Sequence, residues 1–151
     1  MTVTIRAATG TDLPAVLALY AQPEIDDGAV LPLAEAERIF ARFAAYPDYR
    51  LFVAVDGQAV VGSFALLVMD NLGHLGARSA VVEDVVVDPA RQGGGIGRAM
   101  MAHALAEARG KGCYTPAPSS ALKRDAAHAF YAGLGFDRHG YSFLVATGDA
   151  A

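Results

Sequence analysis

Apolar residues recur along the chain with two periods, two and about 3.6 residues, and these periods predict the order of its elements. A period of two, or a short run of branched apolar residues, is typical of a strand, whereas apolar positions three and four residues apart indicate the buried face of a helix. The predicted strands are 3–8, 51–55, 59–69, 79–87, 113–115 and 141–145. The predicted helices are 13–20, 33–43, 96–108 and 125–133. The order βααβββαβαβ, without repeats or a linker, predicts a single α/β domain over residues 1–151.

Turn and breaker residues refine several of these strands. Asp56-Gly57 stands between the second and third strands and is a tight-turn signal, which predicts an antiparallel hairpin. Gly62 lies inside the third strand and predicts a bulge or a close approach of another part of the chain. Pro116 and Pro118 follow residues 113–115 and cannot donate hydrogen bonds to a sheet. We therefore expect this short strand to be an edge, bulged or splayed.

The junction between strand 79–87 and the helix that starts at 96 carries the clearest chemical signal. Asp88-Pro89 ends the strand, and the glycine-rich segment 92–97 follows. Glycines let backbone N–H groups converge without a Cβ in the way, and the helix adds the positive end of its dipole. The junction therefore predicts an anion site, with phosphate as the favoured ligand.

Composition limits the partners and the compartment. A formal net charge of -4 and a pI near 5.4 argue against a nucleic-acid partner, and 54% hydrophobic residues suffice for a sizeable core. The single cysteine, Cys113, excludes an internal disulfide and a thiolate metal cluster, which fits a reducing compartment. The four histidines lack metal-ligand spacing, so no metal site is expected. Without a signal peptide or an apolar span in the sequence, we expect a cytoplasmic protein with no membrane partner.

Two common nucleotide sites fit the glycine segment poorly. A Walker P-loop requires Lys-Ser/Thr after its last glycine, where this chain has Arg98-Ala99. A Rossmann fingerprint occupies the first βα turn of a parallel sheet, whereas a meander of predicted strands precedes these glycines. By itself a glycine cluster leaves several phosphate-bearing ligands open.

Two motifs together resemble one family. Gln92-Gly93-Gly94-Gly95-Ile96-Gly97 resembles the Gln/Arg-x-x-Gly-x-Gly/Ala signature of the GCN5-related N-acetyltransferases, the GNAT superfamily. Residues 127–136 resemble the closing helix-and-strand signature of that family, and the predicted order of elements is similar along nearly the whole chain. The resemblance implies a GNAT fold, with a mixed, mostly antiparallel sheet, a splayed central strand pair and four flanking helices.

The resemblance implies direct transfer of the acetyl group of acetyl-CoA to a primary amine in a ternary complex. Residues 92–97 would hold the CoA pyrophosphate through backbone amides. Residues 85–87, with a bulge in their strand, would splay from 113–115 and admit the pantetheine arm. The expected acceptor is a small molecule, and aminoalkylphosphonates, amino sugars, aminoglycosides and polyamine-like amines all stay open. We expect a monomer or a homodimer.

Glu83 and Asp84 interrupt an otherwise apolar strand, where a buried carboxylate needs a partner or a role. Amine acetylation needs a base, because only the neutral amine attacks the acetyl group. Strand alternation places the two carboxylates on opposite faces, so only one can face the amine directly. A similar Glu-Asp pair in glucosamine-phosphate acetyltransferases favours Glu83 as the base, with Asp84 as the fallback. The structural alternative is that Glu83 pairs with Arg78 or caps a loop.

Tyr131 is the expected acid. It aligns with the tyrosine that faces the CoA sulfur in many members of the family, and a phenol can donate a proton to the leaving thiolate. A packed core tyrosine is the alternative interpretation of Tyr131.

The other predicted site residues belong to the donor and acceptor sides. Residues 122–131 resemble the corresponding stretch of aminoalkylphosphonate acetyltransferases, in which Lys123 and Arg124 could attract an anionic acceptor group or the CoA phosphates. A solvated helix end is the alternative for this pair, as a structural role is for His128 and an exposed loop position for His74. The predicted donor-binding residues are Val85, Val86, Val87, Gln92, Gly93, Gly94, Gly95, Ile96, Gly97, Arg98, Arg124 and His128. The predicted acceptor-binding residues are His74, Asp84 and Ser119.

One competing function class remains. A non-catalytic acyl-CoA-binding or sensing module would keep the glycine segment and lack turnover. The presence of both Glu83 and Tyr131 favours an enzyme.

Overall fold

The computed structural model describes residues 2–118 and 125–134. The chain divides into two compact units, Met1–Ser119 and Ser120–Ala151. The described part of the second unit is helix α4, Asp125–Gly133, as predicted, with the turn residue after it. The predicted strand 141–145 lies outside the described residues, and the single domain over the whole chain stays a prediction.

The first unit is built on a five-stranded sheet in the order β1-β2-β3-β4-β5. Neighbouring strands from β1 to β4 are antiparallel, and β4 and β5 are parallel. This confirms the mixed, mostly antiparallel sheet. The strands are β1 Val3–Ala7, β2 Tyr49–Asp56, β3 Ala59–Met69, β4 Arg78–Val87 and β5 Cys113–Pro118.

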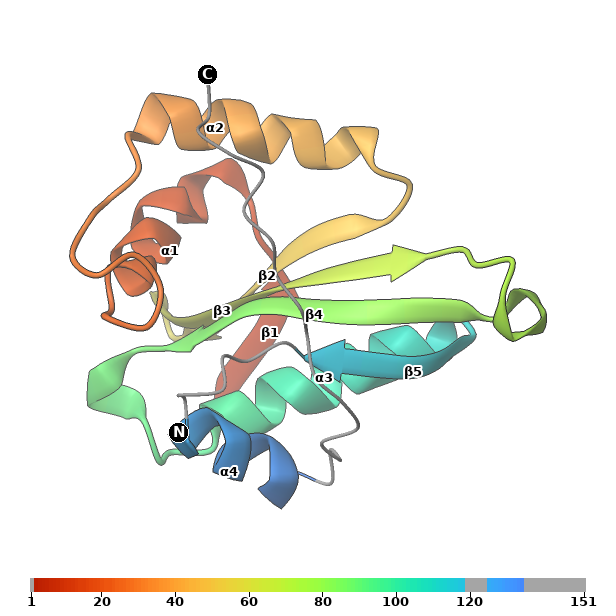
Figure 1. The fold of residues 1–151 in the computed structure, drawn as a ribbon. Helices are drawn as coiled ribbons and strands as arrows, with labels where there is room; N and C mark the ends of the chain where they lie inside the picture. The colour runs from red at the N-terminus through yellow and green to blue at the C-terminus, as the bar shows by residue number, and fades with distance from the viewer. Residues whose placement is uncertain (1, 119–124, 135–151) are drawn as a thin grey trace. The chain divides into compact units, whose positions relative to one another are not determined.

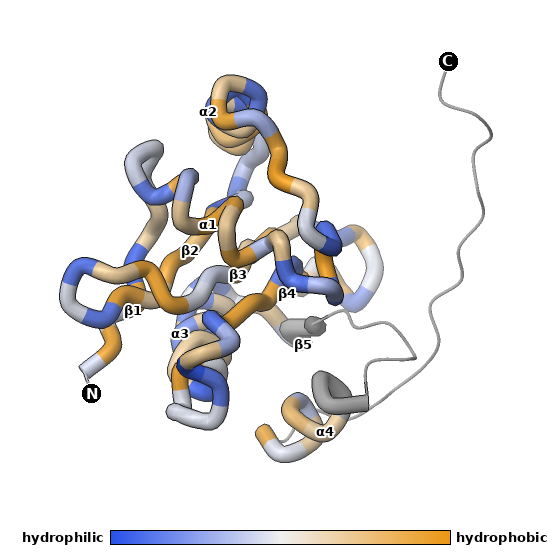
Figure 2. The backbone as a smooth tube through the Cα atoms, turned by 90° about the vertical axis from the view of Figure 1, so that its left-hand side faces the viewer, coloured by the Kyte–Doolittle hydropathy of each residue, from blue (hydrophilic) through white to orange (hydrophobic). Residues whose placement is uncertain are grey.

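Helices lie on both faces of this sheet (Figure 1). α1 (Leu13–Tyr20) and α2 (Leu33–Arg42) cover one face, and α3 (Ile96–Gly110) covers the other. Figure 2 shows that the strands and α1 are largely hydrophobic, whereas many of the connecting turns are hydrophilic. Burial of the apolar helix stripes therefore holds both layers to the sheet. On the α1 face the buried core residues are Leu13, Val16, Leu51, Val53 and Ala65.

The hairpin between β2 and β3 forms as predicted. Asp56 pairs with Ala59, and Gly57 adopts the left-handed backbone that the tight turn requires, with φ of 62°. Gly62 combines the two expected features. The β2–β3 register shifts at this position, and a Cβ on Gly62 would stand 3.0 Å from Met100 Sδ and 3.1 Å from the Val86 carbonyl oxygen. The absence of a side chain at Gly62 thus lets α3 approach the sheet closely.

β5 runs through both prolines instead of ending at Thr115. It is the last described strand of the sheet, and its register with β4 shifts between the Arg78–Cys113 and Ala80–Pro116 pairs. Residues two apart in a strand direct their backbone to the same side, so Pro116 and Pro118 can both turn the position of the missing N–H away from β4. The register shift confirms the bulge among the expected alternatives, and the expected strand end was wrong.

Asp12 joins the start of α1 to β1. Its carboxylate is buried and accepts two hydrogen bonds from the Arg6 guanidinium, at 2.7 and 2.9 Å, and one from the Thr9 N–H at 2.8 Å. The Arg6 hydrogen bonds lower the pKa of Asp12 to about 2, against the opposing effect of burial. The Asp12 carboxylate therefore has a structural role, and the Arg6 guanidinium balances its negative charge.

Candidate active site

β4 contains a bulge at the predicted carboxylate pair. Ala65 of β3 pairs with Glu83 and Ser63 pairs with Val86, so β4 has one more residue than β3 over this stretch. Asp84 takes up the extra length with a left-handed backbone, φ 52°. The bulge that the resemblance implied is confirmed.

The two carboxylates stand at the start of the bulge. The register is interrupted between Glu83 and Val86, where Asp84 and Val85 stand opposite one residue of β3. Both negative charges contribute to the raised pKa of one phenol, Tyr49 on β2, after the larger effect of its burial. That the two carboxylates lie on opposite faces of the strand stays a prediction.

Neither carboxylate has a hydrogen bond or an ion pair with any residue in the described ranges. Arg78 donates to Asp70 at 3.0 Å, which removes the ion pair proposed as the structural role of Glu83. Desolvation raises the pKa of Glu83, and the charge of Asp84 adds to this effect. Desolvation likewise raises the pKa of Asp84, with a smaller contribution from Asp26. Carboxylates with raised pKa values are suited to exchange protons nearer to neutral pH.

Three residues beside this pair were not predicted from the sequence. Burial is the main cause that raises the pKa of Tyr20, and the charges of Asp84 and Asp26 contribute to it. Tyr20 ends α1, Asp26 lies in the loop that follows, and Tyr49 starts β2. Only folding brings these distant segments together, so no local motif marks them. We call Asp26, Glu83 and Asp84 the carboxylate cluster.

The glycine segment forms a turn that leads into α3. Asp88 Oδ1 accepts from the Ala90 N–H at 2.9 Å and caps the short helix Pro89–Arg91. Gly93 and Gly95 then have φ of 83° and 85°. A Cβ at either glycine would meet nothing within 4 Å, so conformation and not space requires glycine at both positions.

The N-terminus of α3 supplies unpaired backbone donors. The Ala99 N–H donates to the Gly95 carbonyl at 3.0 Å as the first bond of the helix, and no described side chain caps it. The N–H groups of residues 96–98 therefore lack intrahelical partners. Together with the helix dipole they fit a phosphate, as the sequence predicted.

The predicted donor-binding residues differ in the exposure of their side chains and in the part of the chain to which they belong. Gln92 and Arg98 are exposed, and the Val86 and Ile96 side chains are buried in the core, so only their backbone can take part. Val85 and Val87 are half-buried in β4, and Gly93 to Gly95 and Gly97 form the turn and first helical residues. Arg124 lies outside the described residues, and His128 belongs to α4 in the second unit.

β5 lies beside a different part of β4 from the part expected. β5 pairs with β4 only from Arg78–Cys113 to Val82–Pro118. Cys113 therefore lies beside Arg78, and residues 113–115 cannot be the partner from which 85–87 separate. Residues 85–87 extend beyond Val82–Pro118, the last described pair of the two strands.

Of three further predicted residues, the structure places one, His74, relative to the carboxylate pair. His74 lies in the loop before β4, at the strand end opposite to the glycine turn, where its ring stands 4.5 Å from the Tyr114 ring. Ser119 is outside the described residues. Tyr131 is buried in the second unit, with its ring centroid 5.2 Å from that of Phe130. The acid role of Tyr131 stays a prediction.

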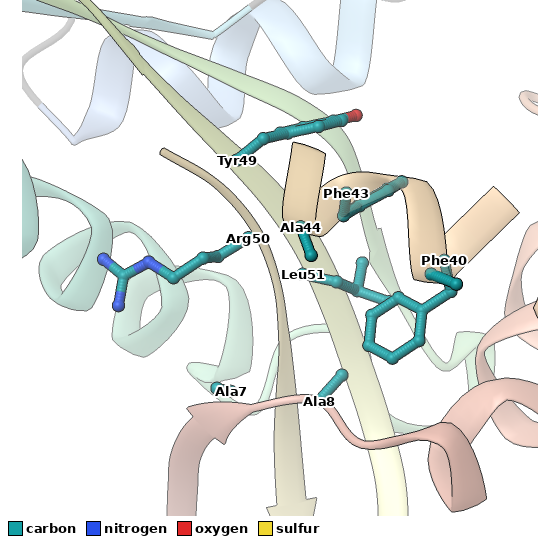
Figure 3. Close-up of a pocket in the computed structure, with 9 residues that line it drawn as sticks. Ala7, Ala8, Phe40, Phe43, Ala44, Tyr49, Arg50 and Leu51 are labelled. Carbon is teal, nitrogen blue, oxygen red and sulfur yellow. The ribbon is translucent and has the colours of Figure 1, made fainter. Parts of the chain in front are cut away.

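An apolar pocket of about 330 Å³ lies under α2, at the β1–β2 side of the sheet (Figure 3). Its charged member, Arg50, already donates to Glu107 at 2.6 Å. Tyr49 forms one wall and stacks on Phe43 with ring centroids 4.2 Å apart. The pocket thus offers apolar surface. Its lining is Ala7, Ala8, Phe40, Ala41, Phe43, Ala44, Tyr49, Arg50 and Leu51.

Over residues 2–118 and 125–134, no helix has the length and apolarity to cross a bilayer. In the same part of the chain, no three side chains of His, Cys, Asp or Glu gather where they could hold a metal ion.

Comparisons with known proteins agree with this geometry. The family model described as Acetyltransferase (GNAT) family matches residues 14–136. The N-alpha-acetyltransferase RimI of Mycobacterium tuberculosis is 34% identical over 138 residues, which cover 91% of this chain and 80% of that protein. A glucosamine 6-phosphate N-acetyltransferase of Trypanosoma brucei brucei is 36% identical over 80 residues, 53% of this chain and 52% of that enzyme, so the match spans about half of this relative. A crystal structure described as a transcriptional regulator of Bacillus halodurans has a TM-score of 0.88 at 27% identity, with 96% of this chain and 99% of that chain covered.

Proposed function

The chain belongs to the acetyltransferase (GNAT) family, and from this premise we propose that it transfers the acetyl group of acetyl-CoA to a primary amine of a small molecule. Members of this family take the acetyl group from acetyl-CoA. The observation that carries the proposal is the carboxylate pair at the β4 bulge, which lacks partners among the described residues and has raised pKa values. The pair precedes the glycine turn by only a few residues along β4.

Each step of this reaction is assigned to a group of the chain. Backbone N–H groups at the start of α3 bind the pyrophosphate of the donor, where the helix dipole adds to their effect. Glu83 removes a proton from the acceptor ammonium, so that the neutral amine forms the new C–N bond as the C–S bond breaks. Tyr131 donates a proton to the departing thiolate. Glu83 thus takes the first amine proton and passes it to solvent. The nitrogen sheds its second proton after the C–N bond has formed, and this proton restores the phenol of Tyr131 once the thiol has left.

The charge of the acceptor side favours a cationic acceptor. Asp26, Glu83 and Asp84 place three carboxylates together, and no described cation pairs with any of them. An acceptor with a second positive charge, such as a polyamine or an aminoglycoside, would compensate these charges, whereas a phosphonate or sugar phosphate would be repelled. We therefore favour polyamine-like and aminoglycoside acceptors over aminoalkylphosphonates and amino-sugar phosphates.

The test is an acceptor panel with thiol release from acetyl-CoA as the readout. The panel contains spermidine, an aminoglycoside, glucosamine 6-phosphate, an aminoalkylphosphonate and a peptide with a free N-terminus. The last acceptor reflects the name of the mycobacterial relative. Fastest turnover with the polycationic amines supports the proposal. Preference for a phosphate-bearing amine or for the peptide would contradict the acceptor class.

The second candidate is an acyl-CoA-binding or sensing module. The similarity to the Bacillus halodurans structure described as a transcriptional regulator favours it. Acetyl-CoA binding by calorimetry separates the two functions. Tight binding without turnover of any amine in the panel would support the module and reject the enzyme.

A further inference from the structure

One side chain ties the loop after α1 to the far end of β4. Gln22 Nε2 donates to the carbonyl oxygen of Val87 at 3.0 Å, although the two residues are 65 positions apart in sequence. The loop lies beside the end of β4 that leads into the glycine turn (Figure 1). The bond therefore links the acceptor side of the site to the strand of the donor side.

The Val87 carbonyl is directed to the open side of β4. The next residue, Asp88, donates its N–H to the Val61 carbonyl of β3 at 2.8 Å. Because neighbouring residues of a strand direct their backbone groups to opposite sides, Val87 directs its own away from β3. The last described pair of β4 with β5 is Val82–Pro118. Gln22 thus supplies a donor to a carbonyl that no described strand pairs with.

Backbone bonds make the loop one compact turn with Gln22 at its base. The Gln22 carbonyl accepts from the N–H groups of Ile25 and Asp27, both at 3.1 Å. The Asp26 N–H donates to the Tyr20 carbonyl at 2.9 Å, at the end of α1. A shift of Gln22 would therefore carry Asp26 with it.

Asp26 is the member of the carboxylate cluster that this loop presents. Its negative charge reaches Asp84 on the β4 bulge and Tyr20 on α1, since it contributes to the raised pKa of both groups. Asp26 itself is exposed and thus open to an acceptor. The distance between Asp26 and the bulge depends on how the loop is held against β4.

We propose that Gln22 is a positioning residue, whose hydrogen bond to Val87 holds Asp26 where it binds the second positive charge of the acceptor. This inference rests on the proposed function and deepens it. Gln22 touches neither reacting group, and it acts through Asp26. It should therefore affect acceptor binding more than the chemical step.

The test compares Gln22→Ala, Gln22→Glu and Asp26→Asn with spermidine as the acceptor. Glutamate keeps the length of glutamine but brings no donor to the carbonyl. Loss of one neutral hydrogen bond predicts an increase of about 3- to 10-fold in the KM for spermidine in both Gln22 variants, with little change in kcat or in the KM for acetyl-CoA. Gln58→Ala, an exposed glutamine in the β2–β3 turn, is the matched control and should change nothing.

A double-mutant cycle separates positioning from an independent contribution. If Gln22 acts through Asp26, the Gln22→Ala/Asp26→Asn double variant binds spermidine no more weakly than Asp26→Asn alone. Multiplicative losses in the double variant would overturn the proposal. A fall in kcat with an unchanged KM for spermidine would overturn it as well.

Hydrogen exchange of the loop amides tests the same bond without turnover. Amides of residues 22–28 should exchange faster in Gln22→Ala than in the wild type or in Gln58→Ala. Unchanged exchange would overturn the proposal even if the enzyme is active. An enzyme that turns over no polyamine would instead refute the proposed acceptor, and the exchange result would still decide whether Gln22 holds the loop.

Discussion

The carboxylate of Asp12 and the pair at Glu83 and Asp84 belong to the same unit but have opposite surroundings. Asp12 is buried and receives four hydrogen bonds, two from Arg6 and two from Thr9, which hold its pKa at about 2. Glu83 and Asp84 have no described hydrogen-bond or ion-pair partner, and desolvation raises their pKa values. The difference shows that the partner, and not the residue type, decides whether a carboxylate stabilises the fold or is available for chemistry.

Removal of the Glu83 charge should have the largest effect. Glu83→Gln keeps the size of the side chain but removes its basicity, so we expect kcat/KM with the best amine to fall about 100- to 10,000-fold. Steady-state kinetics measures the loss, and acetyl-CoA affinity should stay unchanged. Glu37→Gln, on the exposed face of α2, is the matched control. An active Glu83→Gln variant would assign the base to Asp84.

Removal of the Asp12 charge should act on stability alone. Asp12→Asn should lower the free energy of unfolding at pH 7 by about 2 kcal/mol, from a pKa shift of 3.8 to about 2 at 1.36 kcal/mol per unit. Because the folded pKa is the lower one, this stabilisation is full above about pH 4 and is lost as the pH falls towards 2. Urea unfolding at several pH values measures it. Asp70→Asn, at the exposed pair with Arg78, should change stability by less than about 0.5 kcal/mol.

A substitution of Gly62 should change stability, although this glycine pairs with β4, the strand that carries Glu83 and Asp84. Gly62→Ala should cost about 1–3 kcal/mol, because its Cβ would stand 3.0 Å from Met100 Sδ and 3.1 Å from the Val86 carbonyl. Thermal unfolding measures the loss. Gly73→Ala is the control, with nothing within 4 Å of its Cβ and a φ of -65°. Equal stability of the two variants would show that α3 does not need this close approach.

Asp84 should give the smallest effect and the opposite sign to Asp12. Its folded pKa is raised, so the ionised group opposes folding as the pH rises through that pKa, and Asp84→Asn should raise Tm slightly at pH 7. Asparagine tolerates the left-handed backbone at φ 52° as aspartate does, so the bulge is kept. Calorimetry at pH 7 and at pH 4 measures the difference, which should vanish at the lower pH. A lower Tm at pH 7 would mean that Asp84 has a structural role.

The sequence predicted the donor side better than the acceptor side. The glycine turn and the start of α3 follow from residues 92–97, because their conformation depends on local backbone preferences. The acceptor side depends on Tyr20, Asp26 and Tyr49, which come from three distant segments and meet only in the folded chain.

Two features of the sheet have the same physical origin. The residues alone could not place the bulge at Asp84, because a bulge inserts one residue and no local pattern fixes its position. The strand 113–115 was ended too early, because a proline can stay in a strand when the position of its missing N–H is turned away from the paired neighbour. Both depend on the pairing of strands, which the order of predicted elements does not specify.

The pH dependence of kcat/KM for the amine, measured in the wild type and in Glu83→Gln, tests the central claim most directly. The account predicts an acidic limb in the wild type with an apparent pKa above the ordinary 4.5 of glutamate, since desolvation and Asp84 raise it. This limb should be absent from the residual activity of Glu83→Gln. The same acidic limb in both enzymes would contradict Glu83 as the base.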